Sequence, residues 1–238
     1  MTTKVYTSFM HTGMDTTTLL QQKLQPLNKV LTEQYKKEDK LDILKCPAFK
    51  EEIKNTFVYY APYDYTFEYD ENGQPLMSHM SGNKQKMAPE TVNFDDSKGT
   101  YDFRLIQTFS SMGPIFFSEK SLSMSTLPPY MHNIKAPMVV GNFDIGKWFR
   151  SIHPAYVMSN INKVEVKRGE PLLYVKFNTD KKVRLSYYDL TDDIFSIAAK
   201  TGMLKTAYKN AKLNELYNFF SNSLYKKKLL KLIKENLE

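Results

Sequence analysis

Cysteine is almost absent from this sequence, since Cys46 is the one thiol in 238 residues. One thiol cannot form an internal disulfide, and it cannot supply a site that needs several thiolates. Long apolar runs are missing as well: no stretch approaches the roughly eighteen consecutive apolar residues of a membrane-spanning helix. The first residues also lack the apolar segment of a signal peptide. We therefore expect a protein of a reducing compartment that has no transmembrane segment and is not exported by a signal peptide.

Arginine is scarce too, because only four of the 33 basic residues are arginines. Lysine lacks the planar fork with which arginine reads guanine or grips phosphate, so sequence-specific DNA recognition is disfavoured. The positive charge is also local. Residues 200–238 contain nine lysines and three glutamates, which account for +6 of the net charge of +7. We expect this C-terminal tail to meet an acidic partner.

The rest of the composition is ordinary for a globular protein, with 42% hydrophobic and 25% charged residues. The length suits one large domain with an appendage. Near the N-terminus, residues 3–9 predict a short strand, and residues 18–44 show helical spacing that Pro26 interrupts. We interpret residues 1–56 as a mixed segment that packs on a sheet.

The clearest local signal is an alternation of apolar and polar residues over 57–69, which predicts β structure. The apolar positions are Phe57, Tyr59, Ala61, Tyr63, Tyr65, Phe67 and Tyr69. Pro62 interrupts the run, so we expect two strand segments or an edge strand with a bend. A tyrosine-rich face can stack on bases or sugars, but packing in the core or in a subunit contact is favoured. Asn72 and Gly73 then predict a tight turn.

Short β segments continue to residue 188 and are separated by turn residues. We predict strands at 101–109, 114–117, 138–140, 147–152, 164–167, 172–177 and 183–188. The connections between the last three are too short for crossover helices, which predicts consecutive hairpins. The expected class is therefore mainly β within an α+β protein, with an antiparallel β-sandwich or jelly roll over residues 57–190.

Helical periodicity replaces the alternation at Thr191, which predicts an amphipathic helical appendage over residues 191–238. Thr191 is suited to cap the first helix, and Gly202 to end it. A second stretch carries an apolar stripe formed by Leu213, Leu216, Tyr217, Phe220, Leu224, Leu229, Leu232, Ile233 and Leu237. The opposite face carries the partner-contact candidates Lys226, Lys227, Lys228, Lys231 and Lys234. The default interpretation of these lysines is a solvated surface, with the stripe docked on the sheet or on another copy. The rival interpretation is that they contact nucleic acid, an anionic membrane or an acidic protein.

Residues 141–148 match the pattern of a phosphate-binding loop up to its last position. There Trp148 replaces the hydroxyl residue that holds magnesium, and a strand pattern follows where a helix is needed. We therefore interpret Gly141 and Gly146 as turn residues between strands. Cys46 is interpreted as a buried small apolar residue, since no histidine lies near it in the sequence.

The four histidines form no local motif of a zinc or iron site. Distant side chains can still converge inside a β-barrel, where histidines, a carboxylate and arginines at the mouth would make a site. The candidates for such a site are His132, His153, Asp144, Arg150, Arg168 and Glu170. The sequence predicts no catalytic residue, no resident metal and no cofactor.

Several short phrases together resemble an uncharacterised family of tailed-bacteriophage proteins from marine and cyanobacterial hosts, which is distantly similar to bacterial proteins of unknown function. The phrases are Cys46–Phe49, Asn55–Phe57, Ala61–Asp64, Phe116–Ser118, Leu127–Pro129, Phe143–Arg150 and Arg168–Leu172. The resemblance covers residues 4–190 and departs from the family at Ser151, where a proline is usual. It implies a phage source and a jelly-roll-like β fold, and it implies no catalytic residues.

Three functional hypotheses follow. The first is a non-enzymatic phage protein of the virion or the host cytoplasm, a structural component or a host-interaction module whose β domain is a scaffold. Its basic tail would contact another copy, another phage protein or an acidic partner. The alternative is a cupin-like enzyme that depends on a metal or small molecule inside the barrel. The third is a nucleic-acid binder that combines the tyrosine face with the tail.

Overall fold

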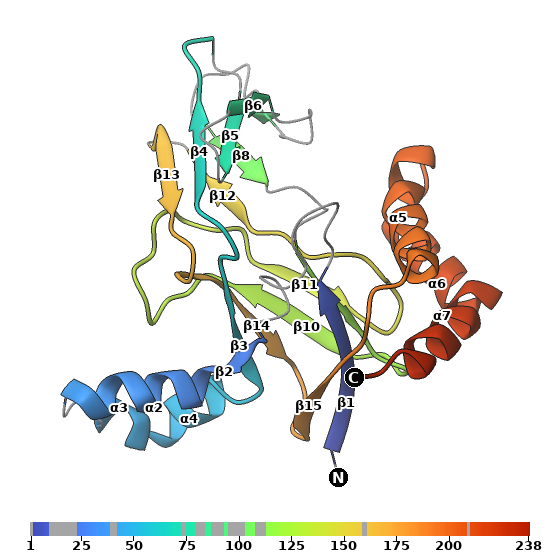
Figure 1. Ribbon diagram of the computed structural model, residues 1–238, viewed down its shortest axis with the longest axis horizontal. Coiled ribbons are helices and arrows are strands. Elements are labelled where there is room, and N and C mark those ends of the chain that lie inside the picture. The colour runs from blue at the N-terminus through green and yellow to red at the C-terminus, as the bar shows by residue number, and fades with distance from the viewer. Residues whose placement is uncertain are drawn as a thin grey trace.

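The computed structural model describes residues 2–9, 23–38, 42–72, 75–79, 84–86, 93–94, 103–107, 113–158, 161–208 and 210–238 (Figure 1). The strands are β1 (Thr2–Phe9), β2 (Gln25–Pro26), β3 (Thr56–Tyr60), β4 (Tyr65–Tyr69), β5 (Pro75–His79), β6 (Lys84–Lys86), β7 (Asn93–Phe94), β8 (Phe103–Gln107), β9 (Pro114–Phe117), β10 (Ser123–Leu127), β11 (Gly141–Asp144), β12 (Ala155–Val157), β13 (Lys163–Val166), β14 (Pro171–Phe177) and β15 (Lys182–Tyr187). The helices are α2 (Leu27–Glu38), α3 (Asp42–Lys45), α4 (Pro47–Glu52), α5 (Asp192–Ala207), α6 (Leu213–Asn222) and α7 (Leu224–Glu235). The predicted class, mainly β with a helical appendage at the C-terminus, is confirmed.

The strands form four sheets. Their orders are β15-β1-β9, β11-β10-β14-β3-β2, β12-β8-β7 and β13-β4-β5-β6. The described pairings are antiparallel, as predicted, except that β1 runs parallel to β15. The predicted strand at residues 3–9 is thus correct, and it joins the N-terminal segment to a strand near the end of the β region. The inner faces of these sheets share one large apolar core, as a sandwich-type arrangement requires.

The predicted hairpins between the last three strands are wrong. β13 pairs with β4, β14 pairs with β3 and β10, and β15 pairs with β1. The pairs β3–β14 and β4–β13 form a single bent ribbon, because the amide of Ala61 donates to the carbonyl of Glu170 (2.8 Å) and that of Gly169 to the carbonyl of Ala61 (2.9 Å). Gly169 has φ +81°, which a residue without Cβ adopts at low cost. The predicted bend at Pro62 therefore lies where this ribbon passes from one sheet to the next.

The alternating aromatic face of the ribbon is packing surface. Tyr59, Tyr63, Tyr65 and Phe67 are each at most 4% exposed. Tyr65 and Phe67 stack with their ring centroids 5.9 Å apart. The favoured interpretation, that this face packs in the core, is confirmed. The nucleic-acid hypothesis needs the same face to be accessible, so the tyrosine face is not available for it.

The region around the two glycines of residues 141–148 differs from the prediction. Residues 141–144 form strand β11, and the predicted strands at 138–140 and 147–152 are not formed. Within residues 147–152, Trp148, Phe149 and Ile152 are apolar because they pack in the interior. Their burial, and not the pairing of a strand, produced the pattern that suggested β structure. Strand β12 follows instead. The turn after β11 is held by the Asp144 carboxylate, which accepts from the amides of Leu122 (3.2 Å) and Gly146 (3.0 Å).

Residues 18–22 of the predicted helical stretch lie outside the described residues. Of the N-terminal helices, α2 begins directly after Pro26, in agreement with the predicted interruption there. The N-terminal helices cover a small core against β3 and β14, made by Leu27, Leu31, Ile53, Val58 and Tyr174. Cys46 precedes the short helix α4 and is exposed, so the prediction that it is buried is wrong. No residue of this six-residue helix is buried; Phe49 packs against the small core, and Ile53, directly after the helix, is buried in it. The turn predicted at Asn72 is present, with its amide bonded to the Asp70 carboxylate (2.9 Å), while Gly73 lies outside the described residues.

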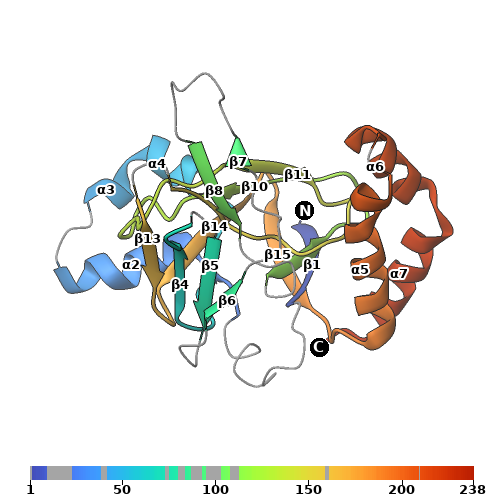
Figure 2. The same cartoon turned by 90° about the horizontal axis from the view of Figure 1, so that it is seen from above.

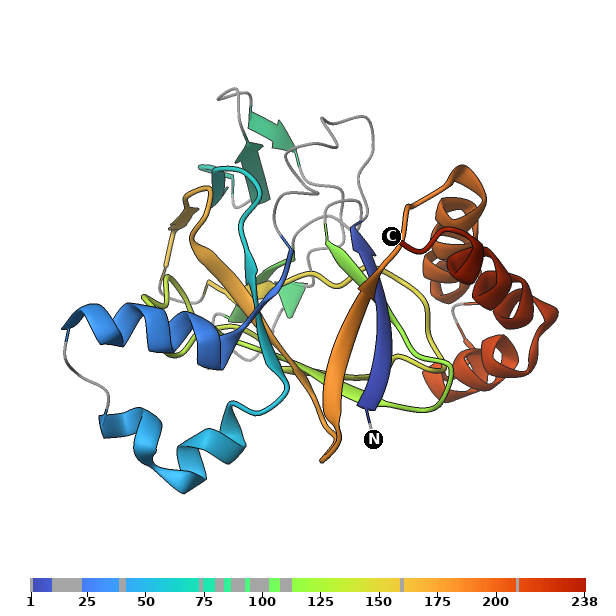
Figure 3. The same cartoon turned by 60° about the horizontal axis from the view of Figure 1, so that its bottom comes forward.

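Two helical groups occupy opposite ends of the molecule. Figures 1 and 3 show α2, α3 and α4 at one end and α5, α6 and α7 at the other, with the sheets between them. Among the helices of the described residues, none combines the length and apolarity that crossing a bilayer requires.

Candidate interaction surface

The first C-terminal helix starts as its sequence predicts. The Thr191 hydroxyl accepts from the amide of Ile194 (3.5 Å), and Asp192 and Asp193 occupy the first turn, where the helix dipole favours anions. The helix does not end at Gly202, as predicted, but continues to Ala207. Glycine only permits termination, and here Thr201 lies on the buried side of the helix and donates to the carbonyl of Ile197 (2.7 Å).

The second stretch is two helices and not one. Ser223 has φ −83° and ψ 158°, an extended backbone that separates α6 from α7, and its hydroxyl donates to the carbonyl of Phe220 (2.7 Å). The break rotates the predicted apolar stripe. Leu216 and Phe220 of α6 are buried, whereas Leu224, directly after the break, is 79% exposed.

The buried part of the stripe docks on the molecule's own sheet. Phe220, Leu229 and Ile233 share a core with Tyr6 of β1 and Phe117 of β9. The chain end adds an isolated bridge between Tyr188 and Leu237, and α6 adds an edge-on contact between Tyr217 and Trp148 with centroids 5.0 Å apart. Figure 2 shows α5, α6 and α7 stacked beside β1 and β15. Of the two docking modes predicted for the stripe, the structure has the one on the sheet.

Two of the five candidate lysines are used inside the molecule. Lys226 donates from Nζ to the carbonyl of Gly146 (2.6 Å) and lies over the Phe117 ring, and burial lowers its pKa. Lys234 lies 2.7 Å from the Glu119 carboxylate, whose hydrogen bond raises the pKa of Lys234. Glu119 also accepts from the Tyr6 hydroxyl (3.0 Å). Both lysines therefore contact the β domain: Lys226 is partly buried there, whereas Lys234 remains 53% exposed.

The other three candidate lysines lie on the surface. Lys227, Lys228 and Lys231 are exposed, and Lys231 is 3.8 Å from Glu235 one turn further on, a pairing that is weak at an exposed site. The lysines predicted to form one face therefore divide into two groups. Lys226 and Lys234 contact the β domain, and the other three lie on the surface.

A group of exposed apolar residues lies on the same helices, and the sequence analysis missed it. Met203, Tyr208, Phe219, Leu224 and Tyr225 are between 52% and 79% exposed. Phe219, Tyr225 and Leu204 border a hollow of about 110 Å³ whose rim includes Lys200. The sequence did contain a signal for this group, because Phe219 and Tyr225 are each adjacent to a residue of the predicted stripe and therefore lie outside the stripe itself. We call these five residues, with Lys200, Lys227 and Lys228, the helical patch.

The six side chains proposed for a site in the barrel do not come together. Asp144, Arg150 and His153 lie around the turn after β11, Arg168 and Glu170 in the bend of the ribbon, and His132 against β14. Within the described residues, no three His, Cys, Asp or Glu side chains group closely enough to hold a metal ion.

Near the β11 turn, Asp144 and Arg150 have structural contacts, whereas the Nδ1 atom of His153 has no hydrogen-bond partner among the described residues. Burial raises the pKa of Asp144, but hydrogen bonds from Ser121, Gly146 and Leu122 hold it below its ordinary value. Arg150 lies 5.8 Å from the Trp148 ring and 5.9 Å from the Phe143 ring. The Nδ1 atom of His153 is buried, and burial together with the positive charge of Arg150 lowers the pKa of His153 to about 3.

The other candidates also have local roles. Glu170 accepts from the amide of Lys167 (2.8 Å) and pairs with Lys135 (3.1 Å), and both contacts lower its pKa. Arg168 has an exposed side chain, and its amide donates to Asp64 (2.8 Å). His132 bonds through Nδ1 to the Tyr174 hydroxyl, and burial lowers its pKa. These contacts stabilise turns and complete a core. The candidate residues therefore do not form a shared catalytic or binding site.

Comparisons with known proteins found no match: no family model fits the chain, and no curated protein or solved structure is significantly similar to it. The resemblance to the phage family therefore stays a prediction.

Proposed function

We propose that this protein is a non-enzymatic interaction module in which the sheets are the scaffold and the helical patch binds an acidic segment of another protein. The observation that carries the proposal is the helical patch itself: five large apolar side chains stay exposed on or directly after helices whose residues Phe220, Leu229 and Ile233 are already buried against the sheet. Contiguous exposed apolar patches often mark interaction sites, and Phe219 and Tyr225 line one hollow together. In the phage setting that the sequence suggests, the module is a virion component or a host-directed protein.

The charge around the hollow selects the partner. Lys200 is on its rim, and Lys228 follows Leu224 by four residues and Tyr225 by three, which makes all three neighbours on the surface of α7. Lys227 is likewise three residues after Leu224. A partner with carboxylates around one apolar side chain is complementary to this arrangement.

The shape favours a protein segment over a flat lipid surface. A hollow of about 110 Å³ between Leu204, Phe219 and Tyr225 accommodates a single large side chain. An anchor residue that fills such a hollow, within a ring of contacts that exclude water, is the usual source of affinity at protein interfaces.

The test is a selection of peptides on the intact protein from a display library in which acidic residues flank one Leu, Phe or Trp. Affinities of the recovered peptides are then measured by fluorescence anisotropy. We expect the double variant Phe219→Ser/Tyr225→Ser to weaken binding about tenfold or more. We expect Lys227→Glu/Lys228→Glu to weaken it and to reduce its dependence on salt.

The matched control is Val140→Ser, because Val140 is 57% exposed but lies outside the helical patch. The proposal is wrong if no peptide is recovered, or if peptides bind the Phe219→Ser/Tyr225→Ser variant as tightly as the unchanged protein. Binding to anionic vesicles, or a dimer in sedimentation that this variant disrupts, would assign the helical patch to a membrane or to a second copy instead.

A further inference from the structure

A second surface feature lies at the opposite end of the molecule, under the N-terminal helices. A groove of about 740 Å³ is bounded by α2, by the segment around α4 and by the first residues of β3 and β15. This volume is within the range of about 300–1,000 Å³ typical of small-molecule sites. The groove is far from the helical patch, since Figure 3 shows the two helical groups at opposite ends.

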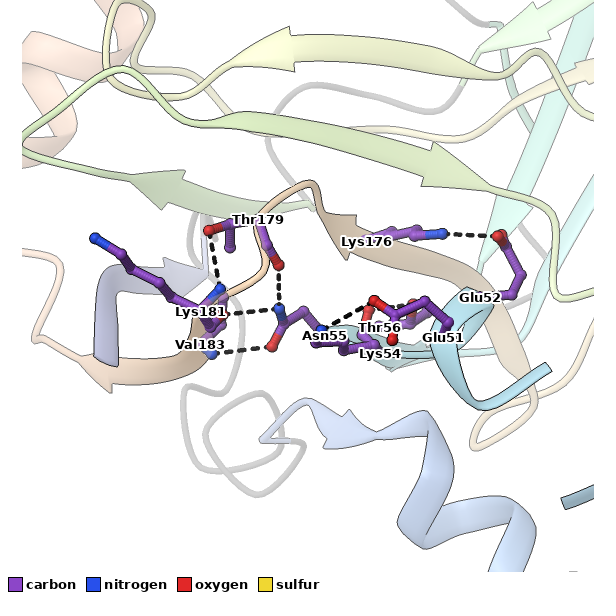
Figure 4. A network of polar contacts seen from close by, with 9 residues as sticks. All are labelled: Glu51, Glu52, Lys54, Asn55, Thr56, Lys176, Thr179, Lys181 and Val183. Carbon is purple, nitrogen blue, oxygen red and sulfur yellow. Dashed lines mark hydrogen bonds and ion pairs between the residues drawn. The ribbon is translucent and has the colours of Figure 1, made fainter. Parts of the chain in front are cut away.

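One side of the groove is fixed by Asn55 (Figure 4). Its Nδ2 donates to the carbonyls of Thr179 (2.7 Å) and Lys181 (2.9 Å), and its Oδ1 accepts from the amide of Val183 (2.9 Å). Asn55 also has φ 53°, a left-handed conformation that asparagine tolerates better than most residues. The carboxamide thus holds the loop before β15 against the start of β3, so the groove is already formed without a ligand.

The base of the groove is apolar. Ile53, Phe57 and Val183 line it and are each at most 8% exposed, which leaves only a small part of each side chain facing the open space. Pro26 and Leu44 add to this surface. A ring or a short aliphatic chain is the kind of group that such a base accepts.

The rim of the groove is basic. Lys29, Lys50, Lys54 and Lys182 line it, against the single carboxylate of Asp180 among the lining residues. Lys29 lies 3.8 Å from Glu33 and Lys54 lies 2.9 Å from Glu51. Lys50 and Lys182 are exposed, and no carboxylate of the described residues lies within ion-pairing distance of either. The rim therefore offers a net positive charge with two lysines available to a ligand.

We infer that this groove binds an organic phosphate, with the apolar part of the ligand on the base and the phosphate groups among the rim lysines. Lysine ammonium groups bind phosphate as compact point charges, without the bidentate geometry of arginine, which is absent from the lining, and a multiply charged phosphate can pair with several of these lysines at once. The Asn28 side chain is a further polar group of the lining that can hydrogen-bond to the ligand, whereas the Thr32 hydroxyl already donates to the carbonyl of Asn28 (2.7 Å) and can only accept.

The experiment is a thermal-shift screen of the full chain with nucleoside mono-, di- and triphosphates and sugar phosphates, followed by calorimetric titration of the compounds that stabilise it. Inorganic pyrophosphate and the unphosphorylated nucleosides are titrated alongside. We expect at least one organic phosphate to raise the melting temperature, and we expect it to bind about tenfold or more tightly than either part alone.

The variant Lys50→Glu/Lys182→Glu reverses two exposed charges that make no ion pair among the described residues, so it should fold normally, which circular dichroism checks. We expect it to lose binding about tenfold or more, whereas Lys227→Glu/Lys228→Glu, with the same charge change at the other end, should bind normally. Failure of every phosphate in the screen, equal losses in both variants, or pyrophosphate binding as tightly as the organic compound would each overturn the inference. None of these outcomes bears on the peptide-binding proposal.

Discussion

Asn55 connects backbone groups that are more than 120 residues away in sequence, and this makes a single side chain important for stability. Each backbone hydrogen bond of its carboxamide contributes about 0.5–1.5 kcal/mol. A non-glycine residue without a suitable side chain at positive φ costs about 1–2 kcal/mol more. The two effects can be separated because alanine removes the bonds and keeps a strained Cβ, whereas glycine removes only the bonds.

We therefore predict that Asn55→Ala lowers the free energy of unfolding by about 2–4 kcal/mol, and that Asn55→Gly lowers it by about 1 kcal/mol less than alanine does. Urea denaturation followed by circular dichroism measures both. If Asn55→Gly is as stable as the unchanged protein, the three hydrogen bonds contribute nothing and this account is wrong.

The side chain of His153, whose Nδ1 atom is buried, makes the stability of the protein depend on pH. Its pKa is about 3 in the folded protein and is expected near 6.5 in the unfolded chain, so between these values the unfolded chain binds the additional proton. Stability is therefore lost as the pH falls below 6.5, and the loss attributable to this group reaches about 2 kcal/mol at pH 5.

The control for this prediction is His153→Asn, because His132 and several carboxylates also titrate on acidification. We expect the stability difference between pH 7 and pH 5 to shrink by about 2 kcal/mol in the variant, measured by urea denaturation at each pH. An unchanged difference would mean that His153 takes up its proton in the folded protein.

At the scale of elements, Gly146 and Gly169 both disfavour a side chain, but for different reasons. A Cβ on Gly146 would lie 2.1 Å from the carbonyl oxygen of Lys120, a backbone atom that cannot move aside. A Cβ on Gly169 would meet nothing within 4 Å, and only its φ of +81° opposes a side chain. Close packing against backbone is the more severe constraint, since relief requires two segments to separate.

We predict that Gly146→Ala destabilises the protein by about 2–4 kcal/mol and Gly169→Ala by about 1 kcal/mol. Chemical denaturation of the two variants under the same conditions compares them directly. The reverse order would show that the turn after β11 relaxes easily and that the bend of the ribbon does not.

Local elements were predictable where a local cause produces them. The alternation over 57–69, the helix start at Thr191 and the interruption at Pro26 each depend on neighbouring residues, and all three are present. The partners of β13, β14 and β15 were not predictable, because pairing depends on strands about 50 to 180 residues away. The short connections that suggested hairpins are instead the places where the chain changes sheet.

The same distinction applies to the candidate sites. The spacing of the lysines correctly indicated a basic face on the last helix. The break at Ser223 rotates α7, so that Lys226 contacts Gly146 and Lys234 contacts Glu119. These contacts could not be predicted, because the partner residues lie far away in the sequence. The groove under the N-terminal helices was missed for the same reason. Its lysines come from α2, α4, the turn between α4 and β3, and β15, and only the fold brings them together.

For the molecule as a whole, the C-terminal helices are part of the structure and not a detachable tail. Phe117 and Phe149 of the β domain share a core with Ile194 and Phe220, and edge-on ring contacts join Phe117 to both other phenylalanines, with centroids 5.5 Å and 6.4 Å apart. Removing the helices would expose an apolar sheet face formed by β1 and β9. Exposed faces of this kind cause aggregation, and the lost burial also removes stabilisation of about 25 cal/mol for each Å² uncovered.

We predict that deleting residues 191–238 yields protein that aggregates or unfolds, and that the deletion does not convert an oligomer into a stable monomer. Light scattering after size-exclusion chromatography and circular dichroism measure this. Phe219→Ser/Tyr225→Ser is the control, because it alters the exposed helical patch and leaves the buried contacts in place, so it should stay folded. A shortened chain that remains monomeric, with an unchanged melting temperature, would contradict the integral role of these helices. It would also remove the reason for locating the interaction surface on the side of the helices that faces away from the sheet.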